Sequence, residues 1–462
     1  MGIRASLAQS SRDGRPTGTH RFRLRPLPPL LRYRLDNALS RLHRARILLY
    51  ARGWKALLDR ASAQASVAGN RTSQTFTGPA PDALSVAPAS PRLSVLWVDE
   101  QLPDPARDSG SLRMFNVLRL LVALGHTVDV LTLSRTEDAS GQRLLHGIGV
   151  RHVGQGTTQR PEAWFAHEGT RYDAVIVSRY HLAWSWFPLL RRLHPRALKI
   201  LDTVDLHHAR ELGEAELRGH ALLRRAARAT RRHELRAIRE ADVAWVVSEA
   251  ERRLLQDLAP EARVEVISNV HLLPVATPRR PPGARLVFVG GAQHPPNVDG
   301  VRWLLTDILP RLLCRRPDCE LHLVGRDLEA CARGAQVPAN VTFHGQLDDL
   351  DALFGACHVG LAPLRFGAGV KGKINHYMAF GLPTVATSCA VEGMHLRQGR
   401  DVLVADDAAG FADAVLRLLD DGALWGVLSS HGRDNVRRHF SIESAIPGIQ
   451  ATFDARLDDR GA

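Results

Sequence analysis

The chain has 462 residues and a formal net charge of +13, and its content of 45% hydrophobic and 24% charged residues is ordinary for a globular protein. This length exceeds what one hydrophobic core usually serves, so we expect two or three domains. Its apolar runs are too short for a membrane-spanning helix, and its N-terminus lacks the pattern of a secretory signal peptide. The five cysteines have no paired spacing, which indicates reduced thiols in a cytoplasmic protein and no zinc site.

Much of the positive charge lies in residues 1–60, which hold fourteen Lys or Arg and three Asp or Glu. From Leu35 onward, leucines recur at helical spacing with arginines between them, and Trp54 follows. A basic amphipathic helix of this kind is typical of segments that lie on an anionic membrane. Docking on another protein and a disordered tail are the alternatives. A nucleic-acid partner is not expected, because no nucleic-acid-binding fold is recognisable.

Residues 61–91 are rich in Ala, Ser, Thr, Gly and Pro and predict a flexible linker. Short apolar strands and helices then alternate through residues 92–275, and the alternation restarts at 283 and continues to 435. The predicted strands are 93–98, 128–133, 174–178, 198–202, 243–248 and 264–267, then 286–290, 320–324, 341–343, 359–362 and 384–387. This pattern predicts an α/β fold of two doubly wound, Rossmann-like domains whose parallel sheets face a shared cleft.

A glycine-rich basic loop, residues 367–373, precedes a short predicted helix and a buried strand in the second domain. Glycines allow backbone N–H groups to approach an anion, a helix N-terminus adds partial positive charge, and lysines add full charges. We therefore predict that Lys371 and Lys373, with the backbone of Gly369 and Gly372, hold a diphosphate. The alternative is a tight turn whose glycines serve the backbone alone.

The segment 365–394, which contains this loop, resembles the donor-binding segment of retaining glycosyltransferases of family 4, which have the GT-B fold. Further segments match modules of bacterial O-antigen and other surface-polysaccharide pathways in the same order, namely 98–133, 201–207, 288–299 and 401–407. The resemblance implies transfer of a sugar from a nucleotide diphosphate sugar to a lipid-linked saccharide, in the cytoplasm or at the inner face of its membrane. It also implies that the last helix, within 436–462, packs back on the first domain.

The resemblance further implies which residues form the site. Asp205 and His207, just after the predicted strand 198–202, are the expected catalytic residues, and Arg179 and His181 are expected to shape the acceptor pocket. Residues expected to bind the donor are Ser109, Gly110, Gly291, His294, Asn297, Gly369, Lys371, Gly372, Lys373, His376 and Glu392. For the loop before the first helix, the alternative is that Asp108 or Ser109 only caps that helix.

The chain departs from the family at several of these positions. Two glutamates that bind the donor sugar and the ribose are replaced by Ala368 and His376, and Glu392 is a candidate substitute. The family's arginine and lysine after the first strand of the second domain are replaced by Gly291 and Asn297, which shifts diphosphate binding to the two lysines.

The acidic runs 348–351 and 406–407 are interpreted as helix starts, so no metal cofactor is expected and the nucleotide sugar is a substrate. Two other functions remain open. One is a GT-B nucleotide-sugar epimerase, which needs no acceptor. The other is a non-catalytic, nucleotide-sugar-binding scaffold of a polysaccharide assembly complex.

Overall fold

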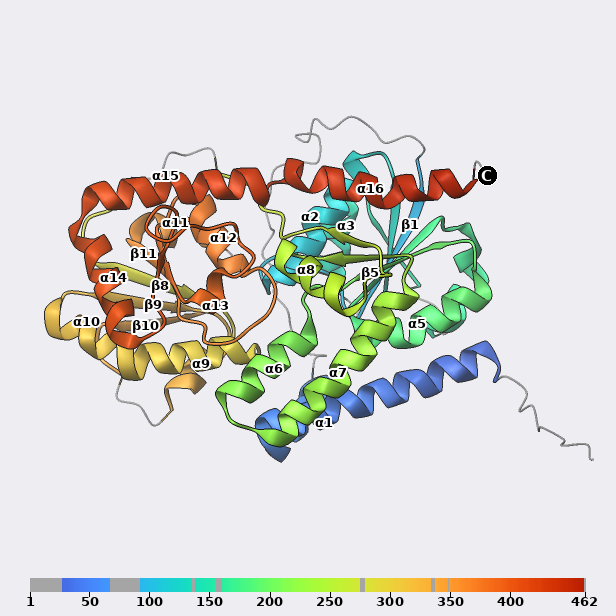
Figure 1. The fold of residues 1–462 in the computed structure, drawn as a ribbon, viewed down its shortest axis with the longest axis horizontal. Coiled ribbons are helices and arrows are strands. Elements are labelled where there is room, and N and C mark those ends of the chain that lie inside the picture. Colours follow the sequence, from blue (N-terminus) through green and yellow to red (C-terminus); the bar gives the residue numbers. More distant parts are fainter. Residues whose placement is uncertain are drawn as a thin grey trace, which may run out of the picture.

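A computed structural model describes residues 27–66, 92–134, 138–154, 160–274, 279–333, 337–347 and 349–460. Within these residues the chain forms two parallel β-sheets, each flanked by helices, as the alternation in the sequence predicts (Figure 1). The start of the basic arm, 1–26, and the part of the predicted linker from 67 to 91 lie outside the described residues.

The described part of the basic arm is helix α1 (Pro29–Ser66). It continues past residue 60, so the prediction that a linker begins at 61 is wrong for residues 61–66. The helix is interrupted at Gly53, whose φ of 78° is outside the helical range. On its inner side, the ring of Tyr33 meets Trp186 edge-on, with 5.6 Å between ring centroids.

The first sheet has seven parallel strands in the order β3-β2-β1-β4-β5-β6-β7. Its strands are β1 (Ser94–Asp99), β2 (Thr127–Thr132), β3 (Arg151–Val153), β4 (Ala174–Ser178), β5 (Leu198–Asp202), β6 (Val243–Val246) and β7 (Val264–Val266). The connecting helices are α2 (Ser109–Ala123), α3 (Ala139–Gly147), α4 (Pro161–Glu168), α5 (Tyr180–Leu193), α6 (His207–Leu217), α7 (Ala221–Glu240) and α8 (Glu249–Leu258). The central strands are almost entirely buried, because helices cover both faces of the sheet.

The second sheet has six parallel strands in the order β10-β9-β8-β11-β12-β13. Its strands are β8 (Arg285–Val289), β9 (Glu320–Val324), β10 (Val341–Gly345), β11 (Val359–Ala362), β12 (Thr384–Ala386) and β13 (Leu403–Val404). The α-helices are α9 (Pro295–Trp303), α10 (Leu309–Arg315), α11 (Asp351–Ala356), α12 (Gly372–Ala379), α13 (Ser388–Val391), α14 (Ala408–Asp420) and α15 (Gly422–His439), with a π-helical turn, Leu304–Ile308, between α9 and α10.

In each sheet, the order in which strands are added reverses at the first strand of the domain. In the first sheet, β1 lies between β2 and β4, and in the second, β8 lies between β9 and β11. Loops on either side of such a switch point diverge, which leaves room for a ligand at the carboxyl ends of the strands. The loops that follow β1, β4, β8 and β11, together with the first turns of the helices after them, contain most of the predicted site residues, including Ser109, Arg179, His294 and Lys371.

The two domains are also joined along one side of the molecule by α15 and the C-terminal helix α16 (Ile442–Arg460), which run on from one another (Figure 1). Helix α16 packs on the first domain through a row of buried side chains at helical spacing, namely Ile442, Ala445, Ile449 and Phe453. The indole Nε1 of Trp245 donates a hydrogen bond of 2.9 Å to Thr452 Oγ1, which fixes the position of the helix along the sheet.

Across the described ranges, no helix combines the length and the apolar character needed to span a bilayer.

The close packing of α16 on β7 gives a prediction about stability. An alanine Cβ at Gly448 would lie 2.7 Å from Ile267 Cδ1 and 2.9 Å from the carbonyl oxygen of Val266, so Gly448→Ala should destabilise the first domain by about 1–3 kcal/mol. The matched control is Gly426→Ala in α15, where nothing lies within 4 Å and alanine should stabilise the helix by about 0.5–1 kcal/mol. Urea denaturation measures both, and a neutral Gly448→Ala contradicts the packing.

Candidate functional site

The predicted anion-binding loop ends at the start of α12. Lys371 is the N-cap residue of this helix, and its largely buried Nζ donates to the carbonyl oxygens of Gly369 at 2.6 Å and Ala368 at 3.3 Å. Gly369 has a φ of 68°, a conformation that side chains disfavour. The lysine thus lies over its own loop, beside the unpaired N–H groups of the helix start.

Lys373 joins this loop to the one after β8. Its Nζ donates to Asn297 Oδ1 at 2.7 Å, and Asn297 Nδ2 in turn donates to the carbonyl oxygen of Gly291 at 2.9 Å. The ammonium also lies 4.0 Å from the ring centroid of Phe288. The structure therefore brings together three of the residues predicted from the sequence to bind the donor, Gly291, Asn297 and Lys373.

Gly290 is a residue that the sequence analysis did not select. Its φ is 154°, and a Cβ there would lie 2.6 Å from Asn297 Nδ2 and 2.8 Å from Lys373 Nζ. The absence of a side chain at this position is what lets the lysine and the amide meet.

The charge on Lys373 is finely balanced. Burial, followed by the neighbouring charge of Lys371, lowers the pKa of Lys373 to about 7. Burial also lowers the pKa of Lys371, although Glu392 acts in the opposite direction. An arriving anion would raise the pKa of both amines, since a nearby negative charge favours the protonated form.

The same loop touches the first domain, and we call this contact the domain junction. It places Gly369, Gly372 and Gly393 of the second domain against Ser109, Asp205, Val247 and Ser248 of the first. A Cβ on Gly372 would lie 2.3 Å from Ser109 Cβ, and one on Gly369 would lie 3.1 Å from Asp205 Cβ. These glycines therefore have a role that the sequence analysis did not predict, which is to let the two domains approach.

On the first domain, α2 begins at Ser109, and Asp108 caps it by accepting from the Ser111 N–H at 2.8 Å. The capping alternative considered from the sequence is thus observed for Asp108. Ser109 faces Gly372 across the domain junction, and the neighbouring Gly110 lies near Val204 and Arg179. The predicted pair Ser109 and Gly110 is therefore at the junction as well.

Asp205 and His207 lie together at the start of α6. The ring Nδ1 of His207 is 3.1 Å from Asp205 Oδ1, and Arg210 forms an ion pair with the same carboxylate. Burial alone would raise the pKa of Asp205, but Arg210 and His207 bring it well below its usual value. Burial lowers the pKa of His207. His207 Nδ1 also lies 3.2 Å from the Asp205 carbonyl oxygen, and since carbonyl and carboxylate oxygens only accept, Nδ1 carries the proton and Nε2 of the neutral ring keeps a lone pair.

Two buried glutamates hold this turn in place. Glu234 of α7 accepts from the His207 N–H at 3.0 Å and the His208 N–H at 3.1 Å, so it caps α6 from a neighbouring helix. Glu251 of α8 accepts from the Leu206 N–H at 3.1 Å, and burial raises the pKa of Glu251 to about 7. The sequence analysis missed both, because each is on a helix far from the turn in sequence.

Asp202, the last residue of β5, has different neighbours from Asp205. Its carboxylate pairs with Arg113 at 2.8 Å, and both side chains are 1% exposed. Arg113 Nη2 also donates to the carbonyl oxygen of Ile267 at 2.9 Å. This pair ties α2 to β5 and β7 inside the first domain and is structural.

The predicted acceptor residues form a charged group after β1 and β4. Arg179 has a φ of 66° and donates through Nη1 to Asp99 Oδ1 at 2.8 Å. His181 Nε2 donates to Glu100 Oε1 at 3.2 Å, and burial lowers the pKa of His181 to about 3. Glu100 also pairs with Arg44 of α1. Asp99 and Glu100 could have been found in the sequence because they directly follow the predicted strand 93–98, whereas Arg44, on a distant helix, could not.

Three predicted donor residues remain, namely His294, His376 and Glu392. His376 lies in an aromatic cluster, 4.9 Å from the ring of Phe354 and 5.7 Å from that of Phe380, and burial lowers its pKa to about 4. Glu392 is exposed and close enough for its charge to act on Lys371. His294 is the N-cap residue of α9, and the charges of Asp205 and Lys373 act on it.

Neither predicted acidic run gathers metal ligands in the part of the chain that the structure describes, where no group of three or more His, Cys, Asp or Glu could hold an ion. Asp407 caps α14 by accepting from the Ala409 and Gly410 N–H groups, and Asp351 begins α11. Asp348 lies outside the described residues.

The domain junction gives a prediction that needs no ligand. Gly372→Ala places a methyl group on Ser109, so the domains should separate, which lowers the thermal midpoint and raises the radius of gyration in small-angle X-ray scattering. Ser109→Gly removes the opposing Cβ, so the double variant Gly372→Ala/Ser109→Gly should recover both values. Equal effects of Gly372→Ala with and without Ser109→Gly contradict this account.

Comparison with known proteins gives two matching family models. One, described as Glycosyltransferase Family 4, matches residues 111–270, and another, described as Glycosyl transferases group 1, matches residues 283–421. The two matches fall on the first and the second Rossmann-like domain, in that order.

Two curated relatives are similar over part of the chain. A protein of the cps region of Klebsiella pneumoniae is 24% identical over 139 residues, which is 28% of this chain and 36% of the relative. A phosphatidyl-myo-inositol mannosyltransferase of Mycolicibacterium smegmatis is 27% identical over 213 residues, which is 43% of this chain and 54% of the relative. The chain thus spans about a third to a half of the length of these relatives.

Solved structures share the fold over about four fifths of the chain. Sucrose-phosphate synthase from Thermosynechococcus elongatus has a TM-score of 0.61 and 18% identity, covering 80% of this chain and 100% of that one. Anabaena HepE in complex with UDP and glucose has a TM-score of 0.59 and 14% identity, covering 79% of this chain and 100% of that one. These similarities establish the fold. Both Rossmann-like domains thus match glycosyltransferase models, and the fold that they form together is GT-B.

Proposed function

We propose that this protein transfers a sugar from a nucleotide diphosphate sugar to a lipid-linked saccharide, with retention of anomeric configuration, in the synthesis of a cell-surface polysaccharide. The observation that carries the proposal is the domain junction, where Gly369 of the lysine loop lies against Asp205 of the first domain, and the charge of Asp205 acts on Lys371. A transferase needs a leaving-group site and an acceptor site next to each other, and the junction supplies both.

The leaving group in this reaction is a nucleoside diphosphate. Lys371, Lys373 and the N-terminus of α12 are arranged to stabilise its developing charge, so no metal ion is required. That HepE is solved with UDP and glucose supports a nucleotide donor of this class. The cps-region relative and the mannosyltransferase relative support a polysaccharide or glycolipid product.

In the proposed reaction His207 acts on the sugar or the acceptor. Asp205 holds the Nδ1 proton, and the lone pair on Nε2 can accept from a hydroxyl group. Since its pKa is lowered, the imidazole is neutral near pH 7 and able to act this way. Arg179, His181 and Glu100, on the neighbouring strand ends, form the adjacent acceptor wall.

The residues available to select the donor sugar differ from the two glutamates usual in the family. Ala368 has no polar side chain and His376 is held by its aromatic neighbours, so neither can accept two hydrogen bonds as a glutamate does. Of the carboxylates whose charge acts on Lys371, Glu392 has the largest effect, so it is the best candidate to replace the missing glutamates. We propose that Glu392 binds a hydroxyl group of the donor.

Nucleotide binding tests the phosphate site. In calorimetric titrations with UDP and GDP, one nucleotide should bind, and Lys371→Ala should weaken it at least about tenfold by removing a buried cation. The control is Arg417→Ala, an exposed cation on α14 of the same domain, which should leave affinity unchanged. Failure of both nucleotides to bind would overturn the phosphate site and with it the proposed donor.

Turnover tests the catalytic assignment. With a panel of nucleotide sugars and saccharide acceptors, His207→Ala should lower product formation by at least about a hundredfold while nucleotide affinity stays the same. Product analysis separates the alternatives. A changed free nucleotide sugar without a saccharide product indicates an epimerase, and nucleotide binding without turnover indicates a scaffold.

Lys373 gives the binding a predicted pH dependence. Its pKa is about 7 in the free protein, so nucleotide affinity should fall as the pH rises through about 7, because the neutral amine must take up a proton to bind the diphosphate. Calorimetry in two buffers of different ionisation enthalpy should detect proton uptake at about pH 8 and much less at about pH 6. Lys373→Arg, which stays charged, should abolish the difference, and uptake that persists in this variant would assign the proton elsewhere.

A further inference from the structure

A row of leucines on α1 faces away from the protein. Leu31, Leu35, Leu39 and Leu42 are 49%, 50%, 45% and 67% exposed, and Leu27 just before the helix is 45% exposed. Helical geometry explains the direction, because nine residues make two and a half turns, so Leu42 lies opposite Tyr33 and Leu31 lies opposite Ser40. Tyr33 and Ser40 are buried at 3% and 1%, which leaves the leucine row on the outer side.

This row is unusual for the molecule. Of the eleven most exposed large apolar side chains in the described ranges, six lie on α1 or next to its start, and the other five are scattered. Single exposed leucines are common on protein surfaces, but a continuous row on one helix indicates a contact surface.

Arginines flank the row on both sides. Residues 29–54 hold six arginines and a single acid, Asp36. Helix α7 runs beside α1, where His43 Nε2 is 3.0 Å from Thr230 Oγ1, and the charge of Arg236 on α7 reaches Asp36. The exposed arginines of these two helices are Arg32, Arg34, Arg41 and Arg46 on α1, and Arg225, Arg228, Arg231, Arg232 and Arg236 on α7.

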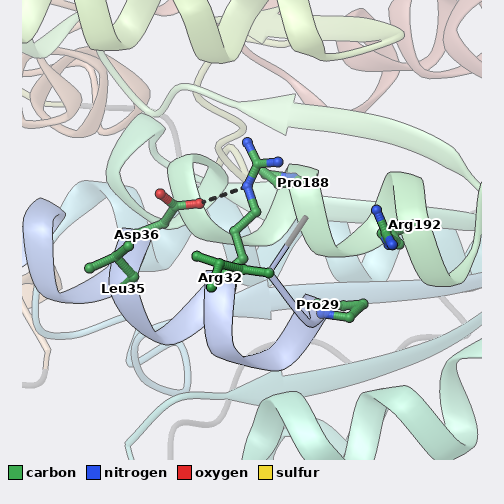
Figure 2. Close-up of a pocket in the computed structure, with 7 residues that line it drawn as sticks. Pro29, Arg32, Leu35, Asp36, Pro188 and Arg192 are labelled. Atoms are coloured by element: carbon green, nitrogen blue, oxygen red, sulfur yellow. Dashed lines mark ion pairs between the residues drawn. The ribbon is translucent and has the colours of Figure 1, made fainter. Parts of the chain in front are cut away.

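A small cavity opens at one end of the row (Figure 2). It has a volume of about 220 Å³ and lies between α1 and α5, with Leu27, Pro29, Leu35 and Pro188 as its apolar lining. Arg32 and Arg192 contribute two guanidinium groups, and Asp36 pairs with Arg32 at 3.6 Å. Apolar walls next to guanidinium groups match the boundary between a lipid phosphate and its acyl chains.

We propose that this α1–α7 face docks the protein on an anionic phospholipid bilayer, with the leucine row at the level of the acyl chains and the arginines among the headgroups. The charge of this face favours a bilayer over a second copy of the chain. A second copy of the chain would bring one arginine-flanked row against another, which is unfavourable, whereas anionic headgroups neutralise both flanks.

Docking would also orient the site. Further along α1, Arg44 pairs with Glu100 after β1, and Arg52 donates to the carbonyl oxygen of Gln293 at 3.0 Å, next to His294. The membrane-facing helix therefore contacts loops of both domains beside the candidate site. That a lipid-linked acceptor uses this proximity rests on the proposed function, whereas the docking itself does not.

Vesicle binding by the full chain tests the docking surface. The chain should co-sediment with vesicles of equal parts phosphatidylglycerol and phosphatidylcholine, and bind vesicles of phosphatidylcholine alone much less. The variant Leu31→Gln/Leu35→Gln/Leu42→Gln should weaken binding at least about tenfold, because three apolar side chains no longer enter the bilayer. Arg41→Gln/Arg228→Gln should weaken binding to the anionic vesicles selectively and reduce its sensitivity to salt.

The matched control is Leu254→Gln/Val337→Gln/Val427→Gln, which changes three exposed apolar side chains elsewhere and should bind as the unaltered chain does. Nucleotide affinity of every variant reports separately on the donor site, so failure of the docking is distinguishable from failure of the proposed function. Equal binding of the leucine variant and the control would overturn the proposal. So would light scattering that shows a dimer which only the leucine variant dissociates, without any change in vesicle binding.

Discussion

The close approach of the two domains through glycine is the constraint on which the candidate site depends. Gly369, Gly372 and Gly393 present bare backbone to the first domain, and a methyl group on Gly372 would lie 2.3 Å from Ser109 Cβ. Because side chains are absent here, the loop before α12 reaches the turn that carries Asp205. The interdomain hydrogen bond from Asn269 Nδ2 to the Val370 carbonyl oxygen, 3.1 Å long, belongs to the same contact.

Burial at this contact sets the charges of the site. Desolvation lowers the pKa of Lys373 to about 7, so its amine responds readily to an arriving anion. Asp205 shows the opposite outcome, because Arg210 and His207 outweigh burial and keep its carboxylate ionised. In the proposed function, one side of the junction receives the diphosphate, and the other holds a histidine in a single tautomer.

Helix α1 adds a third part to this arrangement. It precedes both segments that match glycosyltransferase models, yet Arg44 reaches Glu100 and Arg52 reaches the loop before α9. The inner side of the helix is fixed by Tyr33 and His43, while its outer side carries the leucine row. The same helix therefore contacts the candidate site and presents an apolar surface, which links the position of the site to the proposed docking surface.

The sequence by itself determined the elements and the chemistry of single loops. Alternating apolar strands and helices gave the two parallel sheets, and the glycine-rich loop before α12 marked Lys371 and Lys373, because backbone freedom and charge are local properties. Only the tertiary structure decided which neighbours each residue meets. Asp202 ends strand β5 and Asp205 follows it closely, yet one is buried against Arg113 and the other lies at the junction, since partners distant in sequence decide a carboxylate's role. Likewise, spacing marked α1 as amphipathic, but only its packing on α5 and α7 decided which side is buried and which is left exposed.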